Sequence, residues 1–330
     1  MPDIGAAPSP VLEVEDLTVR FQRRNTDVAA VNGASFTLRA GETLTILGES
    51  GSGKSVSLKA LMGLLPGYAK ITGKVWLNGQ EILGLPAAAL AKLRGGSLSM
   101  IFQEPMAALD PVYTIGEQIA ETIIQHDRVG HATAMKRALG LLEQVKIPSA
   151  ARRLKNYPHE MSGGMRQRAM IALALACSPA VLLADEPTTA LDVTVQIQIL
   201  LLLRQLQQEL GMAIVFVTHD VGAAAEISDR IAVMYAGRFV ESGTAREIIR
   251  TPRHPYTEGL LHSTVHGGMR GTKLETIPGS PPNLASLPPG CAFAARCRYA
   301  VEACRGDIPV AVSETGAMAR CVRAVERVTA

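Results

Sequence analysis

The sequence predicts an α/β fold built on a mainly parallel sheet. Apolar runs of strand length recur along the 330 residues and alternate with segments of helical periodicity. The three clearest runs are TLTILG from Thr43, VLLAD from Val181 and AIVFVTHD from Ala213. After Asp192, apolar residues recur at spacings of three and four as far as Leu210, and Gly211 is placed to end that helix.

Composition excludes several classes of protein. The apolar content of 47% is enough for a sizeable core, and a net charge of +3 is too small to indicate a nucleic-acid partner. The first residues, MPDIGAAPSPVLEVEDL, contain no basic segment followed by an apolar run, so we expect no secretory signal. No stretch reaches about 18 uninterrupted apolar residues, the length that a membrane-spanning helix needs. We therefore expect a cytosolic chain, in which disulfides are rare.

A change of composition near the C-terminus predicts a domain boundary. From about Gly267 to Gly290 the sequence is rich in Gly, Pro and Ser, which is typical of an extended connector. We expect an α/β domain over residues 11–262, followed by a linker and a small cysteine-rich extension over residues 263–330. That extension holds four of the five cysteines.

The segment GESGSGKS fits the phosphate-binding pattern G-x-x-x-x-G-K-[ST] at every position. It follows the apolar run that starts at Thr43 and precedes a helical pattern, which is the context that this motif requires. Backbone N–H groups of the loop would surround the phosphates, Lys54 would reach the β- and γ-phosphates, and Ser55 would bind Mg²⁺. The predicted nucleotide-binding residues are Gly48, Glu49, Ser50, Gly51, Ser52, Gly53, Lys54 and Ser55.

Two carboxylates follow the apolar run VLLAD. In a doubly wound sheet, ligands bind at the carboxyl ends of the strands, which is where Asp185 and Glu186 are expected. We predict that Asp185 serves the Mg²⁺ ion and that Glu186 is the general base for the attacking water.

The chain resembles the ATP-binding cassette superfamily through six motifs in that family's order. They are GESGSGKS, Gln103 in IFQEPMAALDP, MSGGMRQR from Met161, VLLADEP, ALD at Ala190 to Asp192, and His219 in FVTHD. The SGG before an arginine-rich helix distinguishes a cassette from kinases and GTPases. The resemblance implies a P-loop NTPase nucleotide-binding domain with a RecA-like core and a helical subdomain at about residues 104–170.

The resemblance also implies roles for individual residues. Gln103 would touch the metal and the attacking water, His219 would contact the γ-phosphate, and Asp192 would lie at the seam between two cassettes. Phe21 is the candidate for the aromatic side chain that stacks on adenine, although QRRNTD after it looks like an insertion. The residues implied to bind the γ-phosphate of the opposite cassette are Ser162, Gly163 and Gly164.

Longer stretches are similar to the ATPase subunits of bacterial dipeptide, oligopeptide and nickel importers, and this similarity runs from about Val11 to Cys321. It implies an ATPase at the cytoplasmic face of the inner membrane that powers peptide uptake. The implied partners are two transmembrane permeases, a second and different ATPase subunit, and an extracytoplasmic peptide-binding protein. Which of these substrates is carried stays open, because substrate choice belongs to the binding protein and the permeases.

Two other classes of cassette protein fit the sequence less well. Soluble cassettes that act on ribosomes or DNA carry two cassettes in tandem or a long coiled-coil insertion, and this chain shows one cassette and no heptad run between Gln103 and Ser162. Export ATPases usually carry their membrane span on the same chain, and this sequence contains no apolar stretch long enough to be one.

The clustered cysteines indicate a metal site in a cytosolic chain. Gaps of five, six and sixteen residues separate them, and paired C-x-x-C knuckles typical of zinc ribbons are absent. Such spacing favours an iron–sulfur cluster over structural zinc or free thiols, and the resemblance implies [4Fe–4S]. The predicted ligands are Cys291, Cys297, Cys304 and Cys321. We expect Arg296, Arg298 and Arg305 to offset the thiolate charge, and the tail to need the metal in order to fold.

Overall fold

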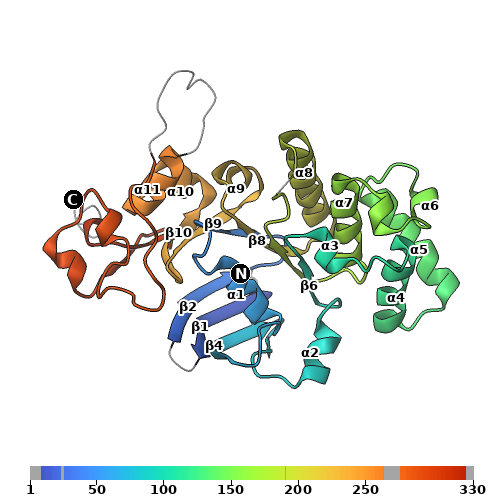
Figure 1. The fold of residues 1–330 in the computed structure, drawn as a ribbon, viewed down its shortest axis with the longest axis horizontal. Helices are drawn as coiled ribbons and strands as arrows, with labels where there is room; N and C mark the ends of the chain where they lie inside the picture. The colour runs from blue at the N-terminus through green and yellow to red at the C-terminus, as the bar shows by residue number, and fades with distance from the viewer. Residues whose placement is uncertain (1–8, 24–25, 190, 264–275, 325–330) are drawn as a thin grey trace, which may run out of the picture. The chain divides into compact units, whose positions relative to one another are not determined.

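A computed structural model describes residues 9–23, 26–189, 191–263 and 276–324, which form two compact units (Figure 1). Unit 1 consists of Met1–Glu13, Thr37–Glu42 and Val75–Val215, and unit 2 consists of Val14–Phe36, Thr43–Lys74 and Phe216–Ala330. The strands β1 (Leu12–Arg23), β2 (Thr26–Leu38), β4 (Ala69–Leu77) and β8 (Ala213–Thr218) cross the boundaries between these segments. Each unit is described by itself.

Unit 1 contains two parallel strands and most of the helices. Strand β6 pairs with β7 in parallel, with Met100 opposite Leu183, and every residue of both strands is buried. The elements of this unit are β5 (Gln80–Glu81), α2 (Ala87–Leu93), β6 (Leu98–Ile101), α3 (Pro105–Ala108), α4 (Ile115–Asp127), α5 (His131–Gln144), α6 (Ala150–Arg153), the 3₁₀ turn η1 (Pro158–Glu160), α7 (Gly163–Ala174), β7 (Val181–Asp185) and α8 (Val193–Leu210).

The helices α4, α5 and α7 pack on one another within unit 1 (Figure 1). The Thr114 hydroxyl begins α4 by accepting a hydrogen bond from the Glu117 N–H (3.3 Å). Ile115, Ile119 and Ile123 recur every fourth residue on α4 and are buried, which gives the helix one apolar face. This group lies within the segment where the resemblance implies a helical subdomain.

Helix α8 is the helix that the apolar spacing after Asp192 predicts. Ile199, Leu202 and Leu206 are buried on one face, and Gly211 ends the helix in the left-handed conformation (φ 64°). Leu210 is 41% exposed, so the predicted face does not extend to the last turn.

Unit 2 is built on a sheet that continues into the C-terminal region. Strand β3 pairs with β9 in parallel, β9 pairs with β10, and β10 pairs with β12, the last two antiparallel. The elements of this unit are β3 (Thr43–Leu47), α1 (Lys54–Leu61), α9 (Val221–Ile227), β9 (Arg230–Tyr235), β10 (Arg238–Thr244), α10 (Ala245–Arg250), α11 (Pro255–His262), the 3₁₀ turns η2 (Ala294–Arg296) and η3 (Glu302–Arg305), β11 (Val310–Val312) and β12 (Met318–Arg320).

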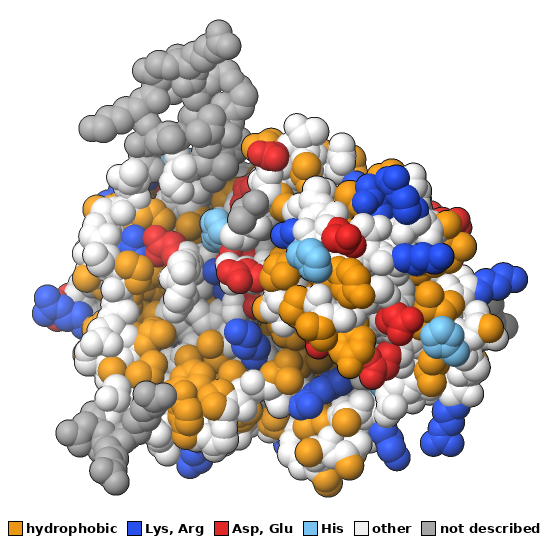
Figure 2. All heavy atoms as spheres, turned by 45° about the vertical axis from the view of Figure 1, so that its right-hand side comes forward, with side chains coloured by type: hydrophobic (Ala, Val, Ile, Leu, Met, Phe, Trp, Pro, Cys, Tyr) orange, Lys and Arg blue, Asp and Glu red, His pale blue; other side chains and the backbone are white. Residues whose placement is uncertain are grey.

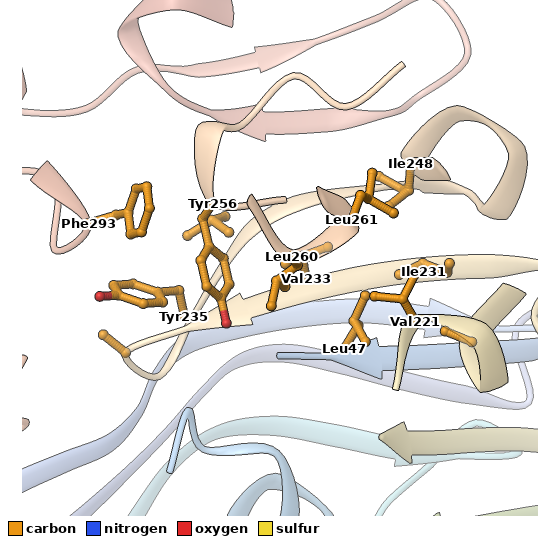
Figure 3. Close-up of a cluster of buried hydrophobic side chains, with 13 residues drawn as sticks. Leu47, Val221, Ile231, Val233, Tyr235, Ile248, Tyr256, Leu260, Leu261 and Phe293 are labelled. Carbon is orange, nitrogen blue, oxygen red and sulfur yellow. The ribbon is translucent and has the colours of Figure 1, made fainter. Parts of the chain in front are cut away.

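An aromatic cluster joins the C-terminal region to the core of unit 2 (Figure 3). The Phe293 ring lies 5.3 Å from the Tyr235 ring and 5.4 Å from the Tyr256 ring, and all three side chains are buried. Aromatic pairs at such distances stabilise a fold by about 0.5–1.5 kcal/mol beyond their buried area. Docking on strand β9 and helix α11 thus stabilises the C-terminal region, a contribution that the expectation of a metal-dependent tail left out.

Parts of the predicted linker and extension, residues 264–275 and 325–330, lie outside the described residues, as does Ala190 of the ALD motif. The domain boundary at residues 262 and 263 stays a prediction. Among the residues that the structure describes, no helix is long and apolar enough to cross a membrane.

Candidate ATP-binding site

The GESGSGKS segment forms the loop between the buried strand β3 and helix α1 in unit 2, as the motif predicts. Two glycines are required by close backbone contacts: a Cβ at Gly48 would collide with the Met234 carbonyl oxygen, and one at Gly53 with that of Ala30. Gly53 also has φ +110°, a conformation that side chains other than glycine rarely adopt. Gly48 and Gly53 therefore lie against the backbone of neighbouring segments, whereas Ser50 and Gly51 are exposed to solvent.

The side chains of the loop fit a phosphate ligand. Lys54 is 4% exposed, and its Nζ donates to the carbonyl oxygens of Gly48 (2.7 Å) and Glu49 (2.9 Å). The Ser52 hydroxyl is buried and has no hydrogen-bond partner among the described residues. Burying a hydroxyl without a hydrogen-bond partner destabilises a fold, so the unpaired Ser52 hydroxyl indicates that this loop binds a polar ligand. Ser55, the predicted Mg²⁺ ligand, is half-buried in the first turn of α1.

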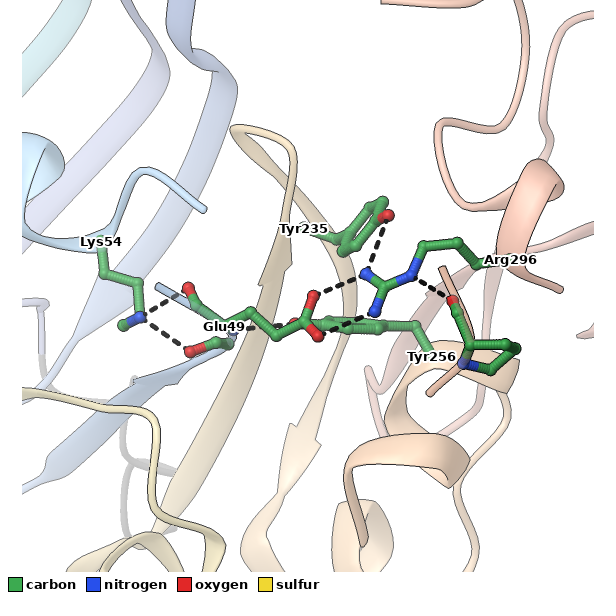
Figure 4. A network of polar contacts seen from close by, with 7 residues as sticks. Glu49, Lys54, Tyr235, Tyr256 and Arg296 are labelled. Atoms are coloured by element: carbon green, nitrogen blue, oxygen red, sulfur yellow. Dashed lines mark hydrogen bonds and ion pairs between the residues drawn. The ribbon is translucent and has the colours of Figure 1, made fainter. Parts of the chain in front are cut away.

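Glu49 is held by residues that the sequence motifs do not include (Figure 4). Its backbone N–H donates to the Tyr256 hydroxyl (2.8 Å), and its carboxylate accepts two hydrogen bonds from Arg296, with Nη1 at 2.7 Å and Nη2 at 3.0 Å. Both partners come from the C-terminal part of unit 2. No sequence signal identified them, because Arg296 stands 247 positions from Glu49 and lies among the cysteines.

Unit 1 contains two of the predicted catalytic residues, Gln103 and Glu186, and the predicted Mg²⁺ ligand Asp185. Asp185 is buried at the end of β7, and Glu186 follows it with φ 46°, an unusual conformation for a glutamate. Gln103 Nε2 donates to Glu186 Oε2 at 3.4 Å, and the Thr189 hydroxyl donates to the same oxygen at 2.9 Å. Two donors therefore hold the Glu186 carboxylate just after β7, and its role as the general base stays a prediction. The sequence reasoning missed Thr189.

The SGG motif begins helix α7 in unit 1. The Ser162 hydroxyl accepts a hydrogen bond from the Met165 N–H (3.4 Å) and so caps the helix. A Cβ added at Gly163 would meet nothing within 4 Å, whereas one at Gly164 would contact Val195. Ser162 and Gly163 are exposed at a helix N-terminus, where backbone N–H groups can bind an anion.

The remaining predicted residues are distributed between the units. Asp192 is exposed and precedes α8 in unit 1, and His219 is exposed directly after β8 in unit 2. The half-buried Phe21 ring lies 6.0 Å from the ring of Tyr68, a residue that the sequence reasoning did not select. The P-loop and the two carboxylates belong to different units, so their meeting at one nucleotide stays a prediction.

The four C-terminal cysteines are free thiols that line one small cavity, together with Phe293 and Arg323. Burial raises the pKa of Cys291 to about 11, and the charges of the neighbouring thiols act in the same direction. Within the described ranges, no group of three or more His, Cys, Asp or Glu is arranged to hold a metal ion.

The three arginines that were expected to offset thiolate charge pair with carboxylates instead. Arg298 Nη2 lies 2.6 Å from Glu258, and Arg305 Nη1 lies 3.5 Å from Glu302. Arg296 pairs with the P-loop as described above. An ordinary carboxylate satisfies a guanidinium well, which is why their position between cysteines was a misleading signal.

Comparisons with known proteins define the class. The family model described as ABC transporter matches residues 31–189. A solved dimeric ATP-binding cassette in a post-hydrolysis state, bound to ADP and Pi, has a TM-score of 0.64 and 30% identity, and the match covers 71% of this chain and 99% of that one. The chain is therefore a cassette-type ATPase, the class whose ligands are ATP and Mg²⁺.

The C-terminal region and the full-length relatives give the family. The model described as oligopeptide/dipeptide transporter, C-terminal region, matches residues 240–304. The oligopeptide transport ATP-binding protein of Salmonella typhimurium is 50% identical over 97% of this chain and 96% of its own length. The dipeptide transport ATP-binding protein of Bacillus subtilis is 48% identical over 89% of this chain and 88% of its own. The chain belongs to this family of ABC transporter ATP-binding proteins.

Proposed function

We propose that the chain hydrolyses ATP to power the uptake of oligopeptides or dipeptides across the inner membrane. One observation carries the proposal: a complete P-loop and signature motif stand on a chain that aligns over nearly its whole length with an oligopeptide transport ATP-binding protein. The relatives' names supply the peptide substrate, and the motifs supply the chemistry.

In the proposed reaction, ATP and water give ADP and phosphate. Lys54 and the loop N–H groups bind the β- and γ-phosphates, and Glu186 takes the proton of the attacking water while Gln103 orients it. Ser55 and Asp185 would hold Mg²⁺, which neutralises developing phosphate charge when it is bound. His219 donates to the γ-phosphate, and Phe21 stacks on adenine.

A second cassette completes the site in this proposal. Ser162 and Gly163 are exposed at the start of α7 and Gly164 is half-buried; in this proposal all three contact the γ-phosphate bound by the partner, with Asp192 at the seam. The partner is a different ATPase subunit of the same transporter. The dimeric state of the related solved cassette supports the pairing of two cassettes.

The permeases would dock where apolar side chains are exposed in unit 1. Met106, Val112 and Tyr113 follow Gln103 closely and are 43%, 69% and 54% exposed. In this proposal these exposed apolar side chains form part of the permease contact. On the face drawn in Figure 2, hydrophobic side chains gather between acidic and basic ones, and no broad basic surface suited to nucleic acid is visible there. The proposed place is the cytoplasmic face of the membrane, and an extracytoplasmic protein would deliver the peptide.

We also propose that Cys291, Cys297, Cys304 and Cys321 bind a [4Fe–4S] cluster, with zinc as the alternative. The support is the cavity that all four thiols line and the donor set, which matches Cys₄ ligation. Since the raised pKa of Cys291 keeps its thiol protonated, the metal would displace a proton on binding. The proposed role is structural.

Two substitutions test the ATPase assignment. Lys54→Ala should abolish ATP binding, because it removes the main positively charged group that contacts the phosphates. Glu186→Gln should bind ATP normally but lower kcat by at least about 100-fold, because only the base is lost. Lys59→Ala, at an exposed lysine of the same helix, is the control that should behave like the wild type. Full hydrolysis by Glu186→Gln would refute the assigned base.

Metal analysis after oxygen-free purification tests the cluster. We expect brown protein with about four irons per chain, and colourless protein after Cys304→Ser. One stoichiometric zinc in colourless wild-type protein would establish the alternative.

A further inference from the structure

Arg296 lies at the end of the turn η2, and each of its guanidinium nitrogens is bonded (Figure 4). Its side chain is 5% exposed. Besides the two bonds to the Glu49 carboxylate, Nε donates to the Pro278 carbonyl oxygen (2.9 Å) and Nη1 donates to the Tyr235 hydroxyl (3.3 Å). The guanidinium also lies 5.8 Å from the Tyr235 ring and 5.8 Å from the Phe293 ring. Hydrogen bonds and aromatic contacts therefore fix the position of the Arg296 guanidinium.

A two-point arginine–carboxylate pair is among the strongest polar contacts in proteins. Its geometry is specific, and removal of one partner leaves the other charge uncompensated. An arginine guanidinium is charged at every pH at which proteins are folded. Arg296 thus supplies a permanent positive charge to the first variable position of the P-loop.

Glu49 connects this charge to the phosphate site. Its carbonyl oxygen accepts from Lys54 Nζ, its N–H donates to Tyr256, and its carboxylate meets Arg296. A carboxylate in a loop that binds ATP opposes the negative triphosphate unless a cation neutralises it. Within unit 2, that cation comes from the C-terminal region.

We propose that Arg296 is a positioning residue for the nucleotide site. It neutralises Glu49 and holds the P-loop in the conformation that accepts phosphate, so that ATP affinity depends on the C-terminal region. The inference rests on the proposed ATP-binding function. It assigns the C-terminal region a part in nucleotide binding that is independent of any metal bound by the cysteines.

The test measures the Kd of a fluorescent ATP analogue with Mg²⁺ on the full chain at low ionic strength. Arg296→Met should weaken binding by about tenfold, within the usual range of coupling between sites. Adding Glu49→Gln to that variant should restore affinity to within about threefold of the wild type, because the unpaired carboxylate is gone. The tenfold loss should also shrink in 1 M salt, which screens the repulsion.

Two further variants separate charge from stability. Arg296→Lys keeps a cation but loses the two-point geometry, so it should bind the analogue more weakly than the wild type and clearly more tightly than Arg296→Met. Arg298→Met breaks a neighbouring surface ion pair, with 54% of the arginine side chain exposed, and should leave the Kd unchanged. Thermal unfolding of each ligand-free variant shows that it is folded at the temperature of the titration.

Three results would overturn the proposal. The first is an Arg296→Met protein that melts earlier but binds the analogue within twofold of the wild type, since this indicates a purely structural contact. The second is a double variant as weak as Arg296→Met, and the third is an Arg296→Lys protein as weak as Arg296→Met. Wild-type binding by Lys54→Ala would instead refute the ATP site itself, so the two failures are distinguishable.

Discussion

The P-loop and the C-terminal region lie in the same unit, yet the sequence reveals them very differently. Eight adjacent residues define the loop, and their types state its chemistry directly. The C-terminal region contacts that loop through Arg296, and helix α11 contacts it through Tyr256; both residues are far from the loop in the sequence. Motifs identify residues that touch a ligand, whereas the residues that hold them in place emerge only from the fold.

The C-terminal region can hold the P-loop only if its packing on the core of unit 2 contributes to the stability of the fold. Phe293 is 4% exposed and packs against Tyr235, Tyr256 and His254, so Phe293→Ala should lower the free energy of unfolding by about 3–5 kcal/mol. Chemical denaturation followed by far-UV circular dichroism measures this loss. Val301→Ala, at a side chain 54% exposed in the same region, should stay within about 0.5 kcal/mol of the wild type. A loss below about 1 kcal/mol for Phe293→Ala would mean that the region does not share the core.

The pH dependence of stability gives a second test of this packing, because His254 is buried against Phe293. Burial lowers the pKa of His254 to about 4 in the folded state, against about 6.5 in an unfolded chain. Between these values the unfolded chain binds the extra proton, so the free energy of unfolding should fall by about 3 kcal/mol as the pH drops from 6.5 to 4. Above pH 6.5 this histidine should contribute no pH dependence.

A matched variant isolates that effect. His254 Nδ1 caps α11 by accepting from the Tyr256 N–H (3.0 Å), and His254→Asn keeps a capping side chain without the titration. Burial also raises the pKa of the neighbouring Glu241. Above the ordinary glutamate pKa, this shift makes the free energy of unfolding fall as the pH rises, which is opposite to the effect of His254. Because both proteins retain Glu241, the difference between their pH profiles reports His254 alone. Parallel profiles would contradict a buried, neutral His254.

The sequence predicted the strands at Thr43–Leu47, Val181–Asp185 and Ala213–Thr218 because their apolar runs are continuous and fully buried. It also predicted the P-loop context and the SGG helix start. It could not show that β12 pairs with β10, because short strands in an irregular tail carry no periodic signal. The purpose of Arg296 was misread for a related reason. Its cysteine neighbours in the sequence indicated thiolate charge, and its partner in space was not visible.

Hydrogen exchange of the P-loop amides tests most directly whether the C-terminal region holds the loop. The measurement compares residues 48–53 in ligand-free wild type, Arg296→Met and Arg298→Met. Because Glu49 is tied to Arg296 in the folded unit, exchange in this segment should become clearly faster in Arg296→Met and remain at the wild-type rate in Arg298→Met. Equal exchange of the P-loop amides in all three proteins would contradict the account.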